Sequence, residues 1–228
     1  MLTSEHVKKI YPMGEIDLEV IKDLSLQIDA GEFVAIVGPS GSGKSTVLNM
    51  LGCLDMPTEG KIVVNDVDVT KLDRTALARF RGEHIGFIFQ SFNLIPVLSV
   101  YENIEYPLIM IQNLPENERE KRISALLNAV EMSDQKNKFP DQLSGGQRQR
   151  VAIARALVTK PKIVFADEPT ANLDTHTSQQ IITLMRSIQQ ESNTTFVFAT
   201  HDPNIVTSVD RIITIVDGKI TSDERSAS

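Results

Sequence analysis

The stretch from Gly38 to Thr46 has the residue types and spacing of a loop that binds phosphate. It reads Gly-Pro-Ser-Gly-Ser-Gly-Lys-Ser-Thr and matches G-x-x-x-x-G-K-[ST]. The glycines let the backbone wrap around a polyphosphate, Lys44 brings a mobile positive charge, and the Ser45 hydroxyl can sit on Mg²⁺. The alternative is a glycine-rich turn with a surface lysine. The residues predicted to bind the polyphosphate are Gly38, Ser40, Gly41, Ser42, Gly43, Lys44, Ser45 and Thr46.

A strand and a helix are expected on either side of this loop to position it. Residues 33–37 form a short apolar run typical of a buried strand, and residues 45–51 read as a helix. The loop then lies at a helix N-terminus, where free N–H groups and the helix dipole attract anions. A dinucleotide fold is disfavoured, because G-x-G-x-x-G starting at Gly41 would need glycine where Thr46 stands.

A second apolar run, residues 162–166, ends in the carboxylates Asp167 and Glu168. In a nucleotidase with such a phosphate loop, the first acid holds Mg²⁺, usually through water. A carboxylate placed like Glu168 can polarise the water that attacks the γ-phosphate. As an isolated acidic pair these residues would more often be a solvated turn or a helix cap. Downstream of the phosphate loop, they predict a metal ligand and a catalytic base.

The segment from Leu143 to Gln147 supports two compatible interpretations. Ser144 and Gln147 have the spacing of a capping box that starts a helix. The cap leaves Gly145 and Gly146 unexplained, although glycines at a helix N-terminus expose N–H groups and can bind a second phosphate. The two phosphate-binding segments lie about a hundred residues apart in the chain. This suggests that one nucleotide is held by two subunits.

Composition limits the function classes. The chain has 228 residues, 41% of them hydrophobic, and a formal net charge of −7, which argues against nucleic acid as a partner. No apolar run reaches the roughly 20 residues that span a bilayer, and residues 1–6 lack a signal-peptide pattern. We therefore expect a cytoplasmic protein with no direct membrane insertion. The only cysteine, Cys53, is expected in the core rather than in catalysis.

The order of expected elements predicts an α/β fold. Strand patterns at residues 2–10, 18–28 and 61–65 precede a helical stretch from about 100 to 159, after which strands and helices alternate. We expect a turn at Tyr11–Gly14, a last strand over residues 211–216, and a polar tail after Gly218. The prediction is one domain over residues 1–228. Its α/β core, with a β subdomain, spans 1–90 and 160–228, and a helical subdomain spans 91–159.

Taken together, these motifs resemble the ATP-binding cassette (ABC) ATPases. The phosphate loop, Gln90 at a strand end, the 143–147 segment, the Asp167-Glu168 strand, the 171–174 stretch and Thr200-His201-Asp202 occur in that family's order. The resemblance implies a P-loop NTPase core with a mixed sheet flanked by helices, an N-terminal antiparallel β subdomain and an inserted helical subdomain. It also implies a head-to-tail homodimer that binds two ATP molecules with Mg²⁺.

By the same resemblance, individual residues acquire roles. Tyr11 would stack on adenine, Gln90 would contact Mg²⁺ and report to an integral membrane subunit, Asp174 would couple the two sites, and His201 would contact the γ-phosphate. His201 alone would be an ordinary strand-end histidine. The subunit would sit peripherally on the cytoplasmic face of the membrane. The expected catalytic residues are Glu168, His201 and Gln90; Ser45, Gln90 and Asp167 would serve Mg²⁺; Ser144, Gly145, Gly146 and Gln147 would hold the second subunit's ATP.

Residues 87–94, 102–104 and 139–142 resemble the bacterial group that includes macrolide-export and lipoprotein-release ATPases, with the cell-division ATPase as a relative. Such proteins pair with separate membrane subunits. The apolar residues after Gln90 are expected to dock that partner, burial within the domain being the alternative: Phe92, Leu94, Ile95, Val97 and Leu98. The resemblance implies an ATP-hydrolysing subunit that drives transport or extraction of a substrate at the membrane. The competing functions are a soluble ABC ATPase for repair or cluster assembly, a cell-division ABC ATPase without transport, and a P-loop small-molecule kinase.

Overall fold

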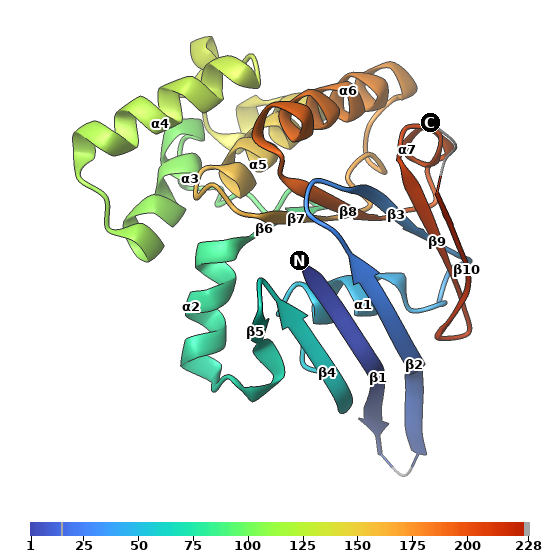
Figure 1. Cartoon of the computed structure of the whole chain (residues 1–228). Coiled ribbons are helices and arrows are strands. Elements are labelled where there is room, and N and C mark those ends of the chain that lie inside the picture. Colours follow the sequence, from blue (N-terminus) through green and yellow to red (C-terminus); the bar gives the residue numbers. More distant parts are fainter. Residues whose placement is uncertain (15, 226–228) are drawn as a thin grey trace.

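The computed structural model describes residues 1–14 and 16–225. Within them, ten strands form one sheet in the order β5-β4-β1-β2-β10-β9-β3-β8-β7-β6 (Figure 1). The strands are β1 (Leu2–Met13), β2 (Ile16–Ile28), β3 (Phe33–Val37), β4 (Glu59–Val64), β5 (Val67–Asp68), β6 (Ile85–Phe89), β7 (Ile163–Asp167), β8 (Thr195–Ala199), β9 (Arg211–Val216) and β10 (Lys219–Arg225). The helices are α1 (Lys44–Leu51), α2 (Arg74–His84), α3 (Val100–Pro107), α4 (Glu116–Ala129), α5 (Gly145–Leu157), α6 (Thr175–Ser192) and α7 (Pro203–Val206).

The strands β9, β3, β8, β7 and β6 run parallel and separate two hydrophobic cores. Alternate residues of β3 face opposite sides: Phe33 and Ala35 belong to the core under the helices α3–α6, whereas Val34 and Ile36 belong to the core around α1. The run 33–37 is buried on both faces, so it reads as a continuous apolar segment. The sheet is therefore covered by helices on both sides, as Figure 1 shows.

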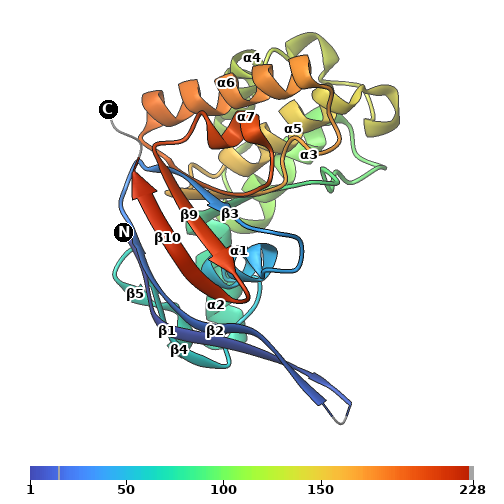
Figure 2. The ribbon, with the colours of Figure 1, turned by 90° about the vertical axis from the view of Figure 1, so that its right-hand side faces the viewer.

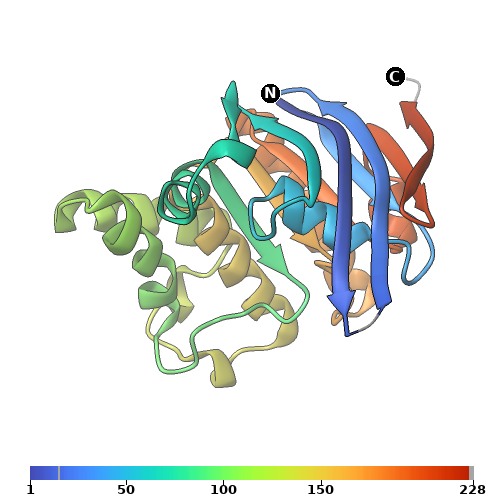
Figure 3. The same ribbon diagram turned by 90° about the horizontal axis from the view of Figure 1, so that it is seen from below.

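The N-terminal strands form an antiparallel layer. β1 pairs with β2 and β4, and β4 pairs with β5. Figure 3 shows these blue and teal strands on the side away from the green and olive helices of the 100–157 region. The fold class is thus confirmed: a mixed sheet with helices, an N-terminal antiparallel region and helices inserted between β6 and β7. The boundaries proposed for the subdomains stay predictions.

The expectation that residues 211–216 form the last strand is wrong, because the polar segment after Gly218 forms a further strand, β10 (Lys219–Arg225). This strand pairs antiparallel with β9 along its length and touches β2 through Lys219 and Asp23, beside which it lies in Figure 2. It is mostly exposed, so its sequence carries no apolar run. The turn expected at Tyr11–Gly14 is also misplaced, since β1 continues to Met13 and Tyr11 pairs with Leu18.

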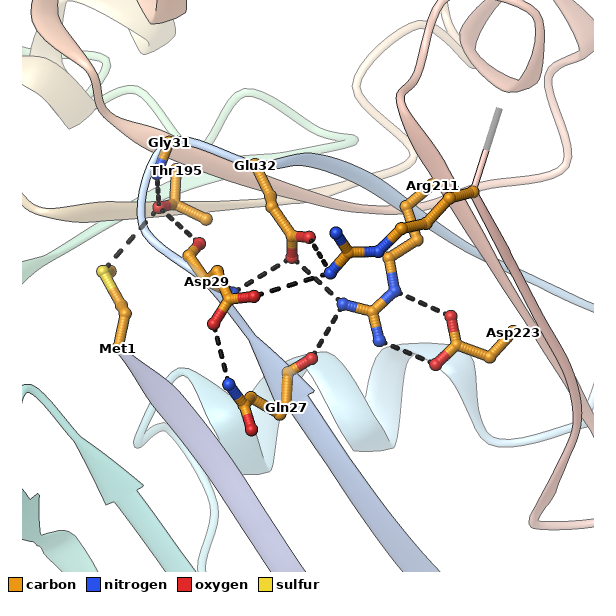
Figure 4. A network of polar contacts seen from close by, with 9 residues as sticks. Met1, Gln27, Asp29, Gly31, Glu32, Thr195, Arg211 and Asp223 are labelled. Atoms are coloured by element: carbon orange, nitrogen blue, oxygen red, sulfur yellow. Dashed lines mark hydrogen bonds and ion pairs between the residues drawn. The ribbon is translucent and has the colours of Figure 1, made fainter. Parts of the chain in front are cut away.

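A buried arginine joins β10 to the core (Figure 4). Arg211 donates from Nε and Nη2 to both carboxylate oxygens of Asp223, each at 2.7 Å, and from Nη1 to the Gln27 carbonyl and to Glu32. Glu32 also pairs with Arg225 at 2.8 Å. The bidentate pair holds the last strand against β9 in a geometry that suits guanidinium and carboxylate.

Candidate functional site

The strand register brings the predicted site residues to one edge of the sheet. Phe89 pairs with Asp167, and Ala199 pairs with both Asp167 and Ile36. Because these strands are parallel, the residues that follow them meet at the carboxyl edge, where α/β folds place ligands. Gln90, Glu168, Thr200 and Gly38 follow β6, β7, β8 and β3 there, respectively.

The phosphate loop closes around its own lysine. Lys44 Nζ donates to the carbonyls of Gly38 at 2.9 Å and Pro39 at 3.0 Å. The helix α1 begins at Lys44, and its N-cap Gly43 has φ 100°, a conformation that L side chains rarely adopt. A Cβ on Gly38 would lie 2.1 Å from the Ile215 carbonyl. A pocket of about 370 Å³ is lined by Val20, Ser40, Gly41, Gly43, Lys44, Ser45, Thr46 and Glu168.

Asp167 and Ser45 meet beside this pocket. The Ser45 hydroxyl donates to Asp167 Oδ1 at 3.0 Å. Burial raises the pKa of Asp167, and the neighbouring Glu168 carboxylate acts in the same direction, against the Ser45 hydrogen bond and the Lys44 charge. A hydroxyl and a carboxylate oxygen next to a phosphate loop are the hard donors that Mg²⁺ prefers, so these residues fit the ion. Within the described part of the chain no group of three or more His, Cys, Asp or Glu side chains could hold a metal.

Glu168 is held by two side chains from the end of β8. His201 Nδ1 lies 2.6 Å from Oε1, and the Thr200 hydroxyl donates to Oε2 at 3.1 Å. The Glu168 backbone has φ 46°, which is uncommon for a residue other than glycine. Its side chain is largely buried, whereas the His201 side chain is 76% exposed. The structure thus fixes the carboxylate at the rim of the phosphate pocket.

Gln90 is exposed just beyond β6. Its carbonyl accepts a hydrogen bond of 2.8 Å from Asn172 Nδ2, so the loop after Glu168 is tied to the end of β6. Glu168, which follows the paired strand β7, lines the phosphate pocket, whereas Gln90 does not. The role of Gln90 towards Mg²⁺ stays a prediction.

Tyr11 lies near the phosphate loop but is engaged by other side chains. Its hydroxyl donates to Asp55 Oδ2 at 2.6 Å, and the Lys9 ammonium lies 4.7 Å from the ring centre. Burial, followed by the hydrogen bond to Asp55, raises the pKa of Tyr11 to about 12, while a contact with Thr46 acts in the opposite direction. The contact with Thr46 brings the Tyr11 hydroxyl close to the last residue of the loop. Stacking on adenine stays a prediction.

The helix α5 begins with the expected capping box. Gln147 N donates to the Ser144 hydroxyl at 3.3 Å, and Ser144 N donates to Gln147 Oε1 at 3.0 Å. A Cβ on Gly146 would lie 2.5 Å from Thr177 Cγ2, so packing against α6 also requires this glycine. None of the residues 144–147 lines the phosphate pocket of the same chain. The residues expected to bind a second phosphate therefore do not meet the phosphate loop of the same chain.

Asp174 caps α6. Its carboxylate accepts from Thr177 N at 3.0 Å and from the Thr177 hydroxyl at 2.6 Å. Both bonds lower the pKa of Asp174, and the bond from the Thr177 hydroxyl has the larger effect. The same threonine contacts Gly146, so Thr177 joins the starts of α5 and α6. Coupling between two nucleotide sites stays a prediction for Asp174.

The apolar segment after Gln90 is split between burial and exposure. Leu94 packs against the hydrophobic core, which favours the burial alternative for this residue, whereas Val97 is 76% exposed. The fully buried Asn103 holds the segment by accepting from Ile95 N at 2.8 Å and donating to the Leu98 carbonyl at 2.9 Å. The end of α3 and the π-helical turn Leu108–Gln112 also expose apolar side chains: Tyr106, Ile109, Met110 and Ile111.

Sequence reasoning assigned no structural role to the polar residues that hold the predicted ones in place. Thr200 holds Glu168, Asn172 holds Gln90, Asp55 holds Tyr11, and Asn103 holds the apolar segment after Gln90. Thr200 could have been found, because it directly follows an apolar strand at the same edge as Glu168. The other three make contacts over 82, 44 and 8 residues of sequence, and no local pattern predicts these contacts. Cys53 is confirmed as a core residue, and burial raises its pKa to about 12.

The phosphate loop, the Asp167-Glu168 strand and the inserted helices define an ATPase of the P-loop class. Residues 21–171 match the ABC transporter family. The chain belongs to this family, as an ABC-type ATPase that forms the ATP-binding subunit of a transporter complex. No helix of the described residues is long and apolar enough to cross a membrane.

Similar proteins cover the whole chain. It is 44% identical over 225 residues to the uncharacterized ABC transporter ATP-binding protein YvrO of Bacillus subtilis, covering 99% of this chain and 97% of that protein. The dimeric post-hydrolysis structure of the cassette MJ0796 of Methanocaldococcus jannaschii, bound to ADP and Pi, superposes with TM-score 0.92 at 44% identity, covering 100% of both chains. The macrolide export ATP-binding/permease protein MacB 1 of Yersinia pestis is 44% identical over 226 residues, which are 99% of this chain and 34% of that protein.

Proposed function

We propose that this subunit hydrolyses Mg²⁺-bound ATP with Glu168 as the base that polarises the attacking water. The observation that carries the proposal is the position of the Glu168 carboxylate, oriented by His201 at 2.6 Å and lining the phosphate pocket. A positioned base contributes roughly 10²–10⁴-fold to such a reaction. His201 serves as the partner that orients Glu168 and reaches the γ-phosphate from its exposed position.

Ser45 and Asp167 are proposed to serve the Mg²⁺ ion. Bound there, the ion would neutralise charge on the β- and γ-phosphates. Within the chain, Ser45 presents its hydroxyl from the first turn of α1, and Asp167 presents a carboxylate from the end of β7. Lys44, now directed at the Gly38 and Pro39 carbonyls, would turn to the phosphates.

The working unit is proposed to be a homodimer with two shared sites. Residues 38–46 of one subunit and Ser144–Gln147 of the other would enclose each ATP. Two features support this: the capping box presents the N-terminus of α5, and that N-terminus lies outside the phosphate pocket of its own chain. The similar cassette MJ0796 forms a dimer with ADP and Pi bound.

A separate integral membrane partner is proposed to dock on the exposed apolar residues of the 97–111 region. Val97 and Met110, 76% and 63% exposed, are the most exposed of them. The similar protein MacB 1 is named as an ATP-binding/permease protein, and this chain covers only its ATP-binding part. The subunit would then lie on the cytoplasmic face of the membrane.

ATP hydrolysis by the purified chain tests the enzyme. Release of ADP and Pi with Mg²⁺ and its loss with EDTA are the expected results, and transfer of phosphate to a small acceptor would favour the kinase alternative. Capture of partners from detergent-solubilised membranes separates the transporter subunit from a soluble ABC ATPase. An integral membrane protein should be retained by the wild-type chain and lost with Val97→Glu.

A further inference from the structure

A second cavity in the described structure lies away from the phosphate loop. Its volume is about 500 Å³, against about 370 Å³ for the phosphate pocket, and it falls in the range of roughly 300–1,000 Å³ typical of small-molecule sites. Lys162 comes directly before β7, Thr194 directly before β8, and Ala30 shortly before β3. The cavity therefore opens at the amino edge of the parallel strands, opposite the edge where ATP is proposed to bind.

The walls of this cavity are mainly apolar. Leu126 comes from α4, Leu157 ends α5, and Ile188 lies in the last turns of α6. Leu126 and Ile188 are only partly buried, and both pack against the core from the cavity side. Such walls favour a ligand with an apolar body of several carbon atoms, because burying that body removes apolar surface from water.

Two ammonium groups give the cavity a positive charge. Lys160 and Lys162 line it, both are exposed, and the lining includes no carboxylate. Neither ammonium has a hydrogen bond or ion pair among the described residues. The helices α5 and α6 end here, and each C-terminus carries a partial negative charge of about half an elementary charge. The two lysines therefore outweigh the two helix ends, and the cavity favours an anion.

We propose that this cavity binds a small amphipathic carboxylate, with its hydrocarbon body between α4, α5 and α6 and its carboxylate at Lys160 and Lys162. Ser192, Asn193 and Thr194 form the rest of the polar rim, and the Asn193 side-chain amide can donate to the same carboxylate. The Ser192 hydroxyl donates to the Ile188 carbonyl at 2.7 Å and bonds to the Thr194 hydroxyl at 2.8 Å. The ligand would contact the C-terminal ends of α5 and α6, whose N-terminal ends carry the capping residues Ser144 and Asp174. This site shares no lining residue with the phosphate pocket.

Titration of the full chain with decanoate, below its critical micelle concentration, tests the site by calorimetry and by amide shifts in ¹⁵N spectra. Saturable binding to one site is expected, with shifts at Lys160, Lys162 and residues 188–194. The double change Lys160→Gln with Lys162→Gln should weaken binding by roughly tenfold, as expected for two partly exposed ion pairs. Lys219→Gln, an exposed lysine on β10, is the matched control and should bind decanoate like the wild type.

Two further measurements separate the charge from the apolar walls. Leu126→Trp should fill the cavity and abolish decanoate binding while ATP binding is retained. Decanol should bind more weakly than decanoate by the same factor as the lysine change. The proposal is overturned if decanoate does not saturate, if the double lysine variant binds as tightly as wild type, or if decanol matches decanoate.

Discussion

Nδ1 of His201 lies 2.6 Å from Oε1 of Glu168, and this contact joins the ends of two neighbouring parallel strands. The hydroxyl of Thr200 holds the other carboxylate oxygen at 3.1 Å. Both oxygens of Glu168 are therefore oriented by the protein itself. A base whose position is fixed in this way needs little reorganisation before it can act on a water molecule.

Loss of the Lys44 charge should weaken ATP binding. Lys44 is the only cation within residues 38–46, and a hydrogen bond to a charged group contributes about 1.5–3 kcal/mol. The Kd of Lys44→Ala for ATP should therefore rise roughly 10- to 100-fold. Nucleotide titration measures this, with Lys219→Ala as the control. Unchanged affinity and turnover would contradict the assignment of the phosphate loop.

Gly146→Ala separates packing from phosphate binding in α5. The new Cβ would lie 2.5 Å from Thr177 Cγ2, and such overpacking costs about 1–3 kcal/mol. Thr177→Ser removes this methyl group and keeps the hydroxyl that bonds to Asp174. The double variant should therefore regain the thermal stability that Gly146→Ala loses. If the ATPase activity of the double variant also returns in full, Gly146 is required for packing and not for binding the second phosphate.

Charged substitutions in the docking region should disrupt assembly without unfolding the chain. Val97→Glu and Met110→Glu change exposed side chains, so the stability should change by less than about 0.5 kcal/mol. Leu94→Glu is the contrasting variant, because Leu94 packs against the core and its change should destabilise the fold. Co-purification with the membrane subunit and thermal unfolding distinguish the two effects. Retention of the partner by both surface variants would rule out this docking site.

The Arg211 and Asp223 pair should make stability depend on pH. The hydrogen bond from Arg211 lowers the pKa of Asp223 in the folded protein. Its stabilisation is therefore fully present above the unfolded-state pKa of about 4 and is lost as the pH falls through the lower folded-state pKa. Asp223→Asn should cost roughly 1–2 kcal/mol at pH 7.

Thermal unfolding of Asp223→Asn between pH 7 and pH 3 checks this prediction. The difference in stability between the variant and the wild type should shrink below about pH 4. The control is Glu83→Gln in the exposed pair with Arg79, which should change stability by no more than about 0.5 kcal/mol. If Asp223→Asn loses as much stability at pH 3 as at pH 7, packing and not the ion pair holds β10.

The buried strands were predictable because each consists of a continuous run of apolar residues. Residues 33–37, 85–89 and 163–166 are apolar on both faces, and each run is followed within one residue by a predicted residue of the site: Gly38, Gln90 and Asp167. The helix starts at Gly43 and Ser144 were equally visible, since glycine-rich loops and capping boxes are local patterns. These elements alone fix the edge of the sheet at which the site lies.

The remaining features depend on contacts between distant residues. β10 has a polar sequence because its side chains are mostly exposed, and its pairing with β9 and Arg211 is a tertiary property. Tyr11 continues β1 although Pro12 follows it, because Leu18 and Asp17 of β2 pair with these residues. The bond between Asn172 and the Gln90 carbonyl spans 82 residues and likewise has no local signature.

The most direct test of the central claim is the oligomeric state of Glu168→Gln, measured by light scattering after gel filtration with and without ATP. The substitution keeps the shape of the side chain and removes the charge that polarises water, so ATP should bind and persist. A ligand at about 100 times its Kd contributes roughly 2.7 kcal/mol to the state that binds it, and two shared sites would contribute twice. A dimer with ATP and a monomer without it are predicted. A monomer at saturating ATP, with hydrolysis near that of wild type, would contradict both the role of Glu168 and the shared site.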